Sequence, residues 1–188
     1  MQEDWLFLWA AADEMEEYLL SSVIFWPLET KKGNTKLGQL PPLTLGNVCL
    51  ARRRLSVSTQ IVAQPEVREC LQKIDDTRGR WRSNWARKAE HEYSERLRLW
   101  MNYCNDKLTG EMSAVEYSSN VRQRVILELL EDEVLKKVGH EEKRLSQLDG
   151  MIQVFTSEGE FIWDSQFMPT FPKDRFWFLY RNLSRERK

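Results

Sequence analysis

A basic and aromatic run between Arg78 and Lys88 is the segment of this sequence best suited to bind a charged ligand. It reads RGRWRSNWARK and contains five basic residues and two tryptophans, with no acidic residue between Asp76 and Glu90. Arginine forks pair with phosphates, and tryptophan rings stack on bases. The candidate contact residues in this run are Arg78, Arg80, Arg82, Arg87 and Lys88.

The same run has a second interpretation, based on packing. Trp81 and Trp85 continue the apolar spacing of a longer helix, which favours burial of both rings. The arginines would then flank a buried face, exposed to solvent or paired with acidic residues at positions 13–17. This packing interpretation is favoured, because arginine and tryptophan alternate on many packed helices.

A second basic cluster, Arg52 to Arg54, belongs to a chain whose charge is unevenly distributed. The first 30 residues carry seven acids and no Lys or Arg, whereas residues 31–60 carry six bases and no acid. Arg52, Arg53 and Arg54 lie near the end of a predicted helix, where basic side chains also stabilise the helix dipole. The net charge of −1 argues against a dedicated nucleic-acid binder.

Metal and phosphate motifs are absent from the sequence. A di-iron bundle needs Glu three residues before each histidine, but Lys88 and Lys137 precede His91 and His140 at that spacing. Neither histidine has a second one four residues later, and no phosphate-binding loop or Gly-x-Ser-x-Gly elbow occurs. We therefore predict no catalytic residue, metal or cofactor, although a scaffold can carry chemistry without a local motif.

The cysteine pattern indicates a reducing compartment. Cys49, Cys70 and Cys104 are odd in number and form no CxxC pair, so we expect a cytoplasmic protein. The acidic N-terminal residues do not resemble a signal peptide. The apolar stretch from Trp5 to Ala12 is too short to span a membrane.

Residues 65–108 are expected to form the central element of the fold. Apolar residues recur there at steps of three, four and seven, as on one face of a helix. A straight helix of this length would measure roughly 66 Å, against about 40 Å for a compact domain of this size. We therefore predict a kink or break near 76–80, where Gly79 weakens the helix.

Other helices are predicted around this element, at 3–21, from Thr44, from Ser113 to about Val138, and at 141–148. In the first, the predicted apolar stripe comprises Trp5, Leu8, Trp9, Ala12, Met15 and Leu19. Ser113 and Glu116 form a capping box, and the helix they start should fold back antiparallel on the central one. Residues 29–42 are predicted to be a flexible loop because they are rich in Gly and Pro.

Residues 151–188 differ in composition and form an aromatic C-terminal extension. We predict a β-hairpin around Ser157–Gly159 and a final helix opened by Pro172. The aromatic side chains cannot all face one side of a helix, so they either meet another chain or wrap over the bundle. The candidate interface aromatics are Phe167, Phe171, Phe176, Trp177 and Tyr180.

Taken together, these features predict a mainly α protein. We expect one helical domain over residues 1–188, built around a long central helical hairpin. The leading functional hypothesis is a non-catalytic interaction or adaptor subunit, because the helix is over-long and the tail is rich in aromatics. A protein partner or self-association would cover these surfaces, and the protein would not contact a membrane. The alternative is a helical nucleic-acid-binding protein that uses the arginine and tryptophan surface.

Overall fold

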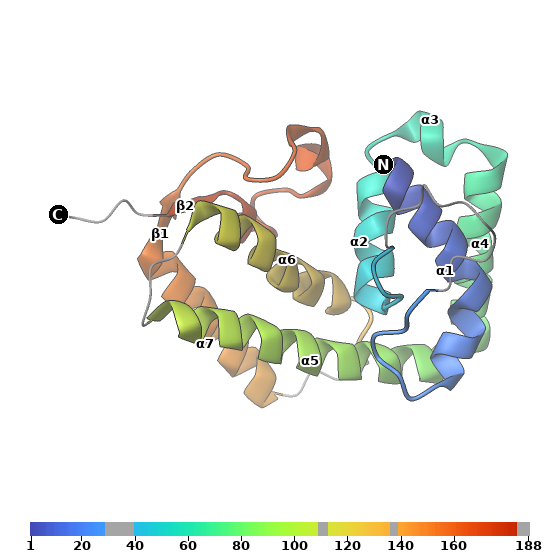
Figure 1. Ribbon diagram of the computed structural model, residues 1–188, viewed down its shortest axis with the longest axis horizontal. Coiled ribbons are helices and arrows are strands. Elements are labelled where there is room, and N and C mark those ends of the chain that lie inside the picture. The colour runs from blue at the N-terminus through green and yellow to red at the C-terminus, as the bar shows by residue number, and fades with distance from the viewer. Residues whose placement is uncertain (29–39, 109–112, 136–138, 184–188) are drawn as a thin grey trace. The chain divides into compact units, whose positions relative to one another are not determined.

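A computed structural model describes residues 1–28, 40–108, 113–135 and 139–183, and it confirms the mainly α fold (Figure 1). The chain divides into two compact units, Met1–Glu92 and Tyr93–Lys188. The boundary lies inside one helix, α5 (Arg82–Leu108), which contributes its first turns to unit 1 and the remainder to unit 2. Most of the predicted loop at 29–42 lies outside the described residues.

Unit 1 is built on three helices, α1 (Gln2–Leu20), α2 (Leu45–Leu55) and α4 (Pro65–Arg80), with a single turn, α3 (Thr59–Val62), before α4. Both α2 and α4 pack against α1 (Figure 1). The Thr44 side chain caps α2 by accepting a hydrogen bond from the Asn47 amide, and Pro65 is the first residue of α4, as predicted. Leucines, Met15, Tyr18 and Ile74 form much of the core.

The predicted break in the long element is present. It lies at Trp81, one residue after the predicted interval 76–80. Trp81 has φ −110° and ψ 37°, outside the helical range, and separates α4 from α5. Its amide still donates to the Thr77 carbonyl and its carbonyl accepts from the Trp85 amide, both at 2.9 Å. The chain therefore turns at one residue with little loss of backbone hydrogen bonding, while Gly79 stays helical.

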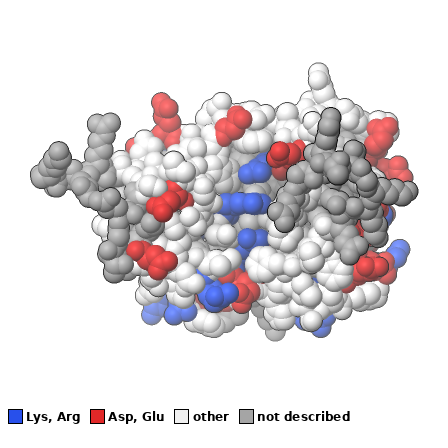
Figure 2. Space-filling model, viewed as in Figure 1, with Lys and Arg blue, Asp and Glu red and all other residues white. Residues whose placement is uncertain are grey.

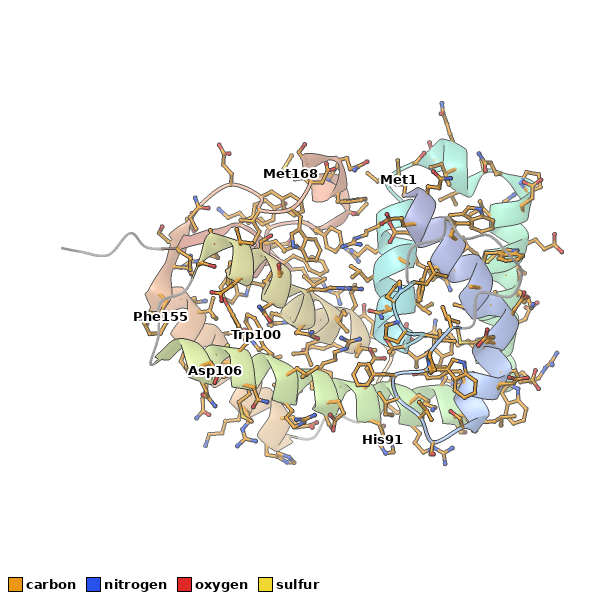
Figure 3. The ribbon with its side chains drawn as sticks, viewed as in Figure 1. Met1, His91, Trp100, Asp106, Phe155 and Met168 are labelled. Atoms are coloured by element: carbon orange, nitrogen blue, oxygen red, sulfur yellow. The ribbon has the colours of Figure 1, made fainter. Side chains whose placement is uncertain are left out.

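Unit 2 contains the rest of α5, then α6 (Ala114–Leu130) and α7 (Gly139–Phe155). The capping box of Ser113 and Glu116 starts α6, and α6 runs antiparallel to α5 as predicted (Figure 1). Trp100, fully buried, projects from α5 into the interior of this unit (Figure 3). The helical hairpin is therefore confirmed.

Two helix ends were placed wrongly. The helix from Ser113 stops at Leu130 and not at Val138, because Glu131, Asp132 and Glu133 put negative charge at the helix end that already carries a negative dipole. The last predicted part of that helix, 136–138, lies outside the described residues. In contrast, α7 continues through Gly150 to Phe155.

The predicted β-hairpin and final helix are both wrong. Strand β1 (Thr156–Glu158) pairs antiparallel with β2 (Arg181–Leu183), with Ser157 opposite Asn182, so the two strands are far apart in sequence. Between them the chain forms two 3₁₀ turns, η1 (Ser165–Thr170) and η2 (Trp177–Leu179). Phe171, Phe176 and Phe178 of this segment are all fully buried.

Candidate interaction surface

The arginines of α2 are engaged within unit 1. Arg52 forms a bidentate ion pair with Asp75 of α4, with N–O distances of 2.6 and 3.0 Å. Arg54 pairs with Asp4 of α1 at 3.5 Å, and Arg53 is half-buried. The positive charge of this cluster is therefore partly neutralised by acids of the same unit.

The run from Arg78 to Lys88 lies around the turn at Trp81. The Arg78 guanidinium lies over the ring of Trp85, 5.6 Å from its centroid, and Arg80 pairs with Glu16 of α1 at 3.5 Å. Trp85 is buried and Trp81 half-buried, so both rings contribute to packing. Arg82 and Arg87 are exposed. The Arg80 pair matches the packing interpretation, in which residues 13–17 neutralise these arginines.

Lys88 differs from its neighbours because it is buried. Its ammonium group donates to the Ser21 hydroxyl and the Val23 carbonyl, and it lies 4.4 Å from the centroid of the Tyr18 ring. Burial lowers the pKa of Lys88, and the nearby charge of Arg87 lowers it further. The side chain therefore ties α5 to the segment after α1 and is not accessible to a polyanion.

The aromatic residues of the C-terminal extension point mostly inward. Phe171 and Phe176 have no exposed surface and meet edge to face at 5.1 Å. The Tyr180 hydroxyl donates to the Phe171 carbonyl at 2.8 Å, and Trp177 packs on Phe178. Of the five candidate interface aromatics, the half-buried members Phe167, Trp177 and Tyr180 keep some accessible surface. The extension wraps over the helices of unit 2, and its three fully buried phenylalanines, Phe171, Phe176 and Phe178, stabilise that unit.

A buried ionic network that the sequence did not reveal holds this extension against α6 and α7. Arg124 of α6 forms two hydrogen bonds to Asp149 of α7, at 2.9 and 3.0 Å, and one to Glu128 at 3.0 Å. Glu128 also accepts from Arg175 of the extension at 2.9 Å, and Arg175 reaches Asp132. No local motif predicts this network, because its members come from three separate segments.

The exposed apolar residues of unit 1 gather at α1 and the segment that follows it. Trp9 and Leu20 are 55% and 52% exposed, and Val23 and Phe25 are 43% and 37% exposed. The prediction that Trp9 belongs to the buried stripe is therefore wrong. The predicted members Leu8, Ala12, Met15 and Leu19 are buried as expected. Phe7 and Ala11 are buried beside them, and Trp9 lies about 100° around the helix from Leu8.

Acidic side chains accompany these apolar residues. Asp13 and Glu16 lie between Trp9 and Leu20 on the same side of α1, and Glu17 is exposed beside them. Lys73 and Arg80 of α4 pair with Asp13 and Glu16. Figure 2 shows that Asp and Glu side chains are surrounded by uncharged residues on the visible face of the molecule. We call Trp9, Asp13, Glu16 and Leu20 the outer stripe of α1.

The described residues offer no sign of a metal centre. His91 and His140 are both exposed, and His91 points outward from α5 (Figure 3). Within the described ranges, no three His, Cys, Asp or Glu side chains are grouped so that they could hold a metal ion.

No helix in the described part of the chain is long and apolar enough to cross a membrane. In comparisons with known proteins, no family model, curated protein or solved structure matches this chain.

Proposed function

We propose that this protein is a non-catalytic interaction subunit that binds a protein partner through the outer stripe of α1 and the apolar segment after it. The observation that carries the proposal is the exposure of Trp9 and Leu20 on a helix whose other large apolar residues are mostly buried. Tryptophan is among the residues that contribute most to binding at protein interfaces.

Val23 and Phe25 support the same proposal. They follow α1 closely and are 43% and 37% exposed, so they extend the apolar surface of Trp9 and Leu20 along the chain. Trp26, between α1 and α2, is held in place by its backbone hydrogen bonds with Leu43 and by its indole, which donates to Glu14 at 2.7 Å. The segment is therefore fixed, and a fixed apolar surface loses little entropy when it binds.

Affinity purification of the tagged full-length chain from its native cells tests the proposal. We expect one protein to co-purify in stoichiometric amount, and the double variant Trp9→Ala/Leu20→Ala to lose it. The control is Val154→Ala, which removes a still more exposed apolar side chain from unit 2. The proposal is wrong if no protein reaches stoichiometric amount, or if the double variant retains the same protein.

Nucleic-acid binding is a second candidate, supported by the exposure of Arg78, Arg80, Arg82 and Arg87 around the turn at Trp81. Four arginines within ten residues can contact adjacent phosphates. Fluorescence anisotropy with a labelled duplex or single strand should then show affinity that falls steeply with salt. Replacing Arg82 and Arg87 with Ala should reduce that slope, and negligible binding at low salt would eliminate this candidate.

A further inference from the structure

The outer stripe of α1 has a defined pattern of apolar and acidic side chains. Trp9, Asp13, Glu16 and Leu20 follow one another at steps of four, three and four residues, so they lie within about 60° of one another around the helix. The distance from Trp9 to Leu20 along the axis is about 16 Å. The stripe therefore has an apolar residue at each end and two carboxylates between them.

The carboxylates of the stripe are only weakly engaged. Asp13 and Lys73 pair at 2.6 Å, but both side chains are 52% exposed. Glu16 and Arg80 pair at 3.5 Å and are 48% and 68% exposed. Ion pairs as exposed as these contribute little to stability, because solvent screens their charges. A partner with basic side chains could therefore pair with these carboxylates at little cost.

We infer that the partner of this surface presents a basic amphipathic helix, an inference that depends on the proposed function. Its apolar residues would be eleven positions apart, matching Trp9 and Leu20, with Lys or Arg between them facing Asp13 and Glu16. Helices recognise one another through such side-chain patterns at i, i+4, i+7 and i+11. Opposite charges across the contact speed association and exclude partners of the wrong sign.

A second copy of this chain fits the stripe poorly. Asp13 lies four residues after Trp9, and Glu16 lies four residues before Leu20. An antiparallel copy that places Trp9 against Leu20 therefore also places Asp13 against Glu16, so that acid faces acid. Such like-charge pairs oppose association. The charge pattern thus favours a different, basic partner over a symmetric dimer.

A synthetic helix tests this inference with the full-length protein. The probe is a fluorescently labelled, alanine-based peptide of 18 residues with Leu at positions 4 and 15 and Lys at positions 8 and 11. We expect saturable binding by anisotropy, at least tenfold weaker for a peptide with Glu at positions 8 and 11. Trp9→Ala and Leu20→Ala should each weaken binding of the Lys peptide about tenfold.

A charge variant of the protein keeps the test independent of any effect on folding. Asp13→Asn/Glu16→Gln alters only exposed side chains and should reduce the preference for the Lys peptide to less than threefold, whereas Val154→Ala should leave it unchanged. The inference is overturned if Lys and Glu peptides bind equally to the wild type, or if neither binds. If either of these results is obtained but a protein still co-purifies in stoichiometric amount and depends on Trp9, the proposed function stands and the partner belongs to another class.

Discussion

The buried network around Arg124 leads to a quantitative prediction for the stability of unit 2. The side chains of Arg124, Glu128 and Asp149 are only 7%, 14% and 18% exposed, so solvent screens their charges little. Arg124→Met keeps most of the side-chain volume and removes three hydrogen bonds to charged groups. Asp149 then loses the guanidinium that neutralises it, whereas Glu128 keeps Arg175.

The expected loss follows from these contacts. Breaking a buried ion pair by removing one partner costs about 3–5 kcal/mol, because the other charge stays buried without compensation. We expect about 4 kcal/mol for Arg124→Met. Replacing both partners with apolar side chains of similar size is often close to neutral. The double variant Arg124→Met/Asp149→Leu should therefore lose about 2 kcal/mol less than the two single variants added together.

Urea denaturation followed by far-UV circular dichroism measures these values, and a double-mutant cycle isolates the coupling between the two residues. The control pair is Lys173 with Glu158, which are 3.2 Å apart but 52% and 75% exposed. Lys173→Met should change stability by less than about 1 kcal/mol. A loss below 1 kcal/mol for Arg124→Met, or strictly additive losses in the cycle, would refute the importance of this network.

Four further predictions concern single positions. Gly79→Ala should stabilise unit 1 by about 0.5–1 kcal/mol in thermal unfolding, since Gly79 is helical and an added Cβ would meet nothing within 4 Å. Gly159→Ala should destabilise by about 1 kcal/mol because its Cβ would lie 2.2 Å from the Asn182 amide nitrogen, and adding Asn182→Ala should restore stability. Burial lowers the pKa of Lys88 below 10.5, so the unfolded state binds the Lys88 proton more tightly than the folded state does. The free energy of unfolding of the wild type, relative to that of Lys88→Met, should therefore rise as the pH increases from this lowered pKa to 10.5. A difference between the two proteins that does not change with pH would contradict this. Burial raises the pKa of Cys104 to about 12, so we expect this thiol to react with an aromatic disulfide reagent at pH 8 only after unfolding, as peptide mapping would show.

Local signals predicted the helix starts of this fold well. Thr44, Pro65 and the Ser113–Glu116 box each lie where a side chain or a fixed φ stabilises the first turn, and all three are confirmed. These signals act within four residues, so the sequence contains all the information they need. The antiparallel direction of α6 relative to α5 was also predictable from a local feature, the short connection between the two helices.

Most of the differences between prediction and structure have another cause, long-range packing; the exception is the end of α6, where the acids that follow Leu130 act locally. Trp81 interrupts the long helix although Gly79 is the weaker helix former, and Gly150 remains inside α7 where Asp149 is held by Arg124. The strand at Thr156 finds its partner 25 residues later, in a segment whose aromatic side chains resemble a helix in sequence. Periodicity cannot distinguish these outcomes, since they depend on contacts between distant segments.

The candidate surface was missed because an apolar residue at a helical spacing is assumed to be buried. Trp9 lies next to the buried face of α1. It is about 100° around the helix from Leu8, near the edge of that face. The acids at positions 13–17 were predicted as partners of the arginines, as Arg80 and Glu16 show, but the partners of Arg52 and Arg54 could be assigned only once α1, α2 and α4 were packed together.

The uninterrupted course of α5 across the boundary at Glu92 and Tyr93 limits how this protein can be divided experimentally. A fragment cut at that boundary would leave the carbonyls of the last turn before the cut without the amides that now bond to them. Glu92 would then be the C-terminal residue, and the negative charge of its new α-carboxylate would lie close to its side chain. The side-chain carboxylate of Glu92 accepts a hydrogen bond from the Gly46 amide at 2.9 Å. Truncations meant to isolate either half should therefore extend several turns past the boundary, so that each piece retains a complete copy of the shared helix.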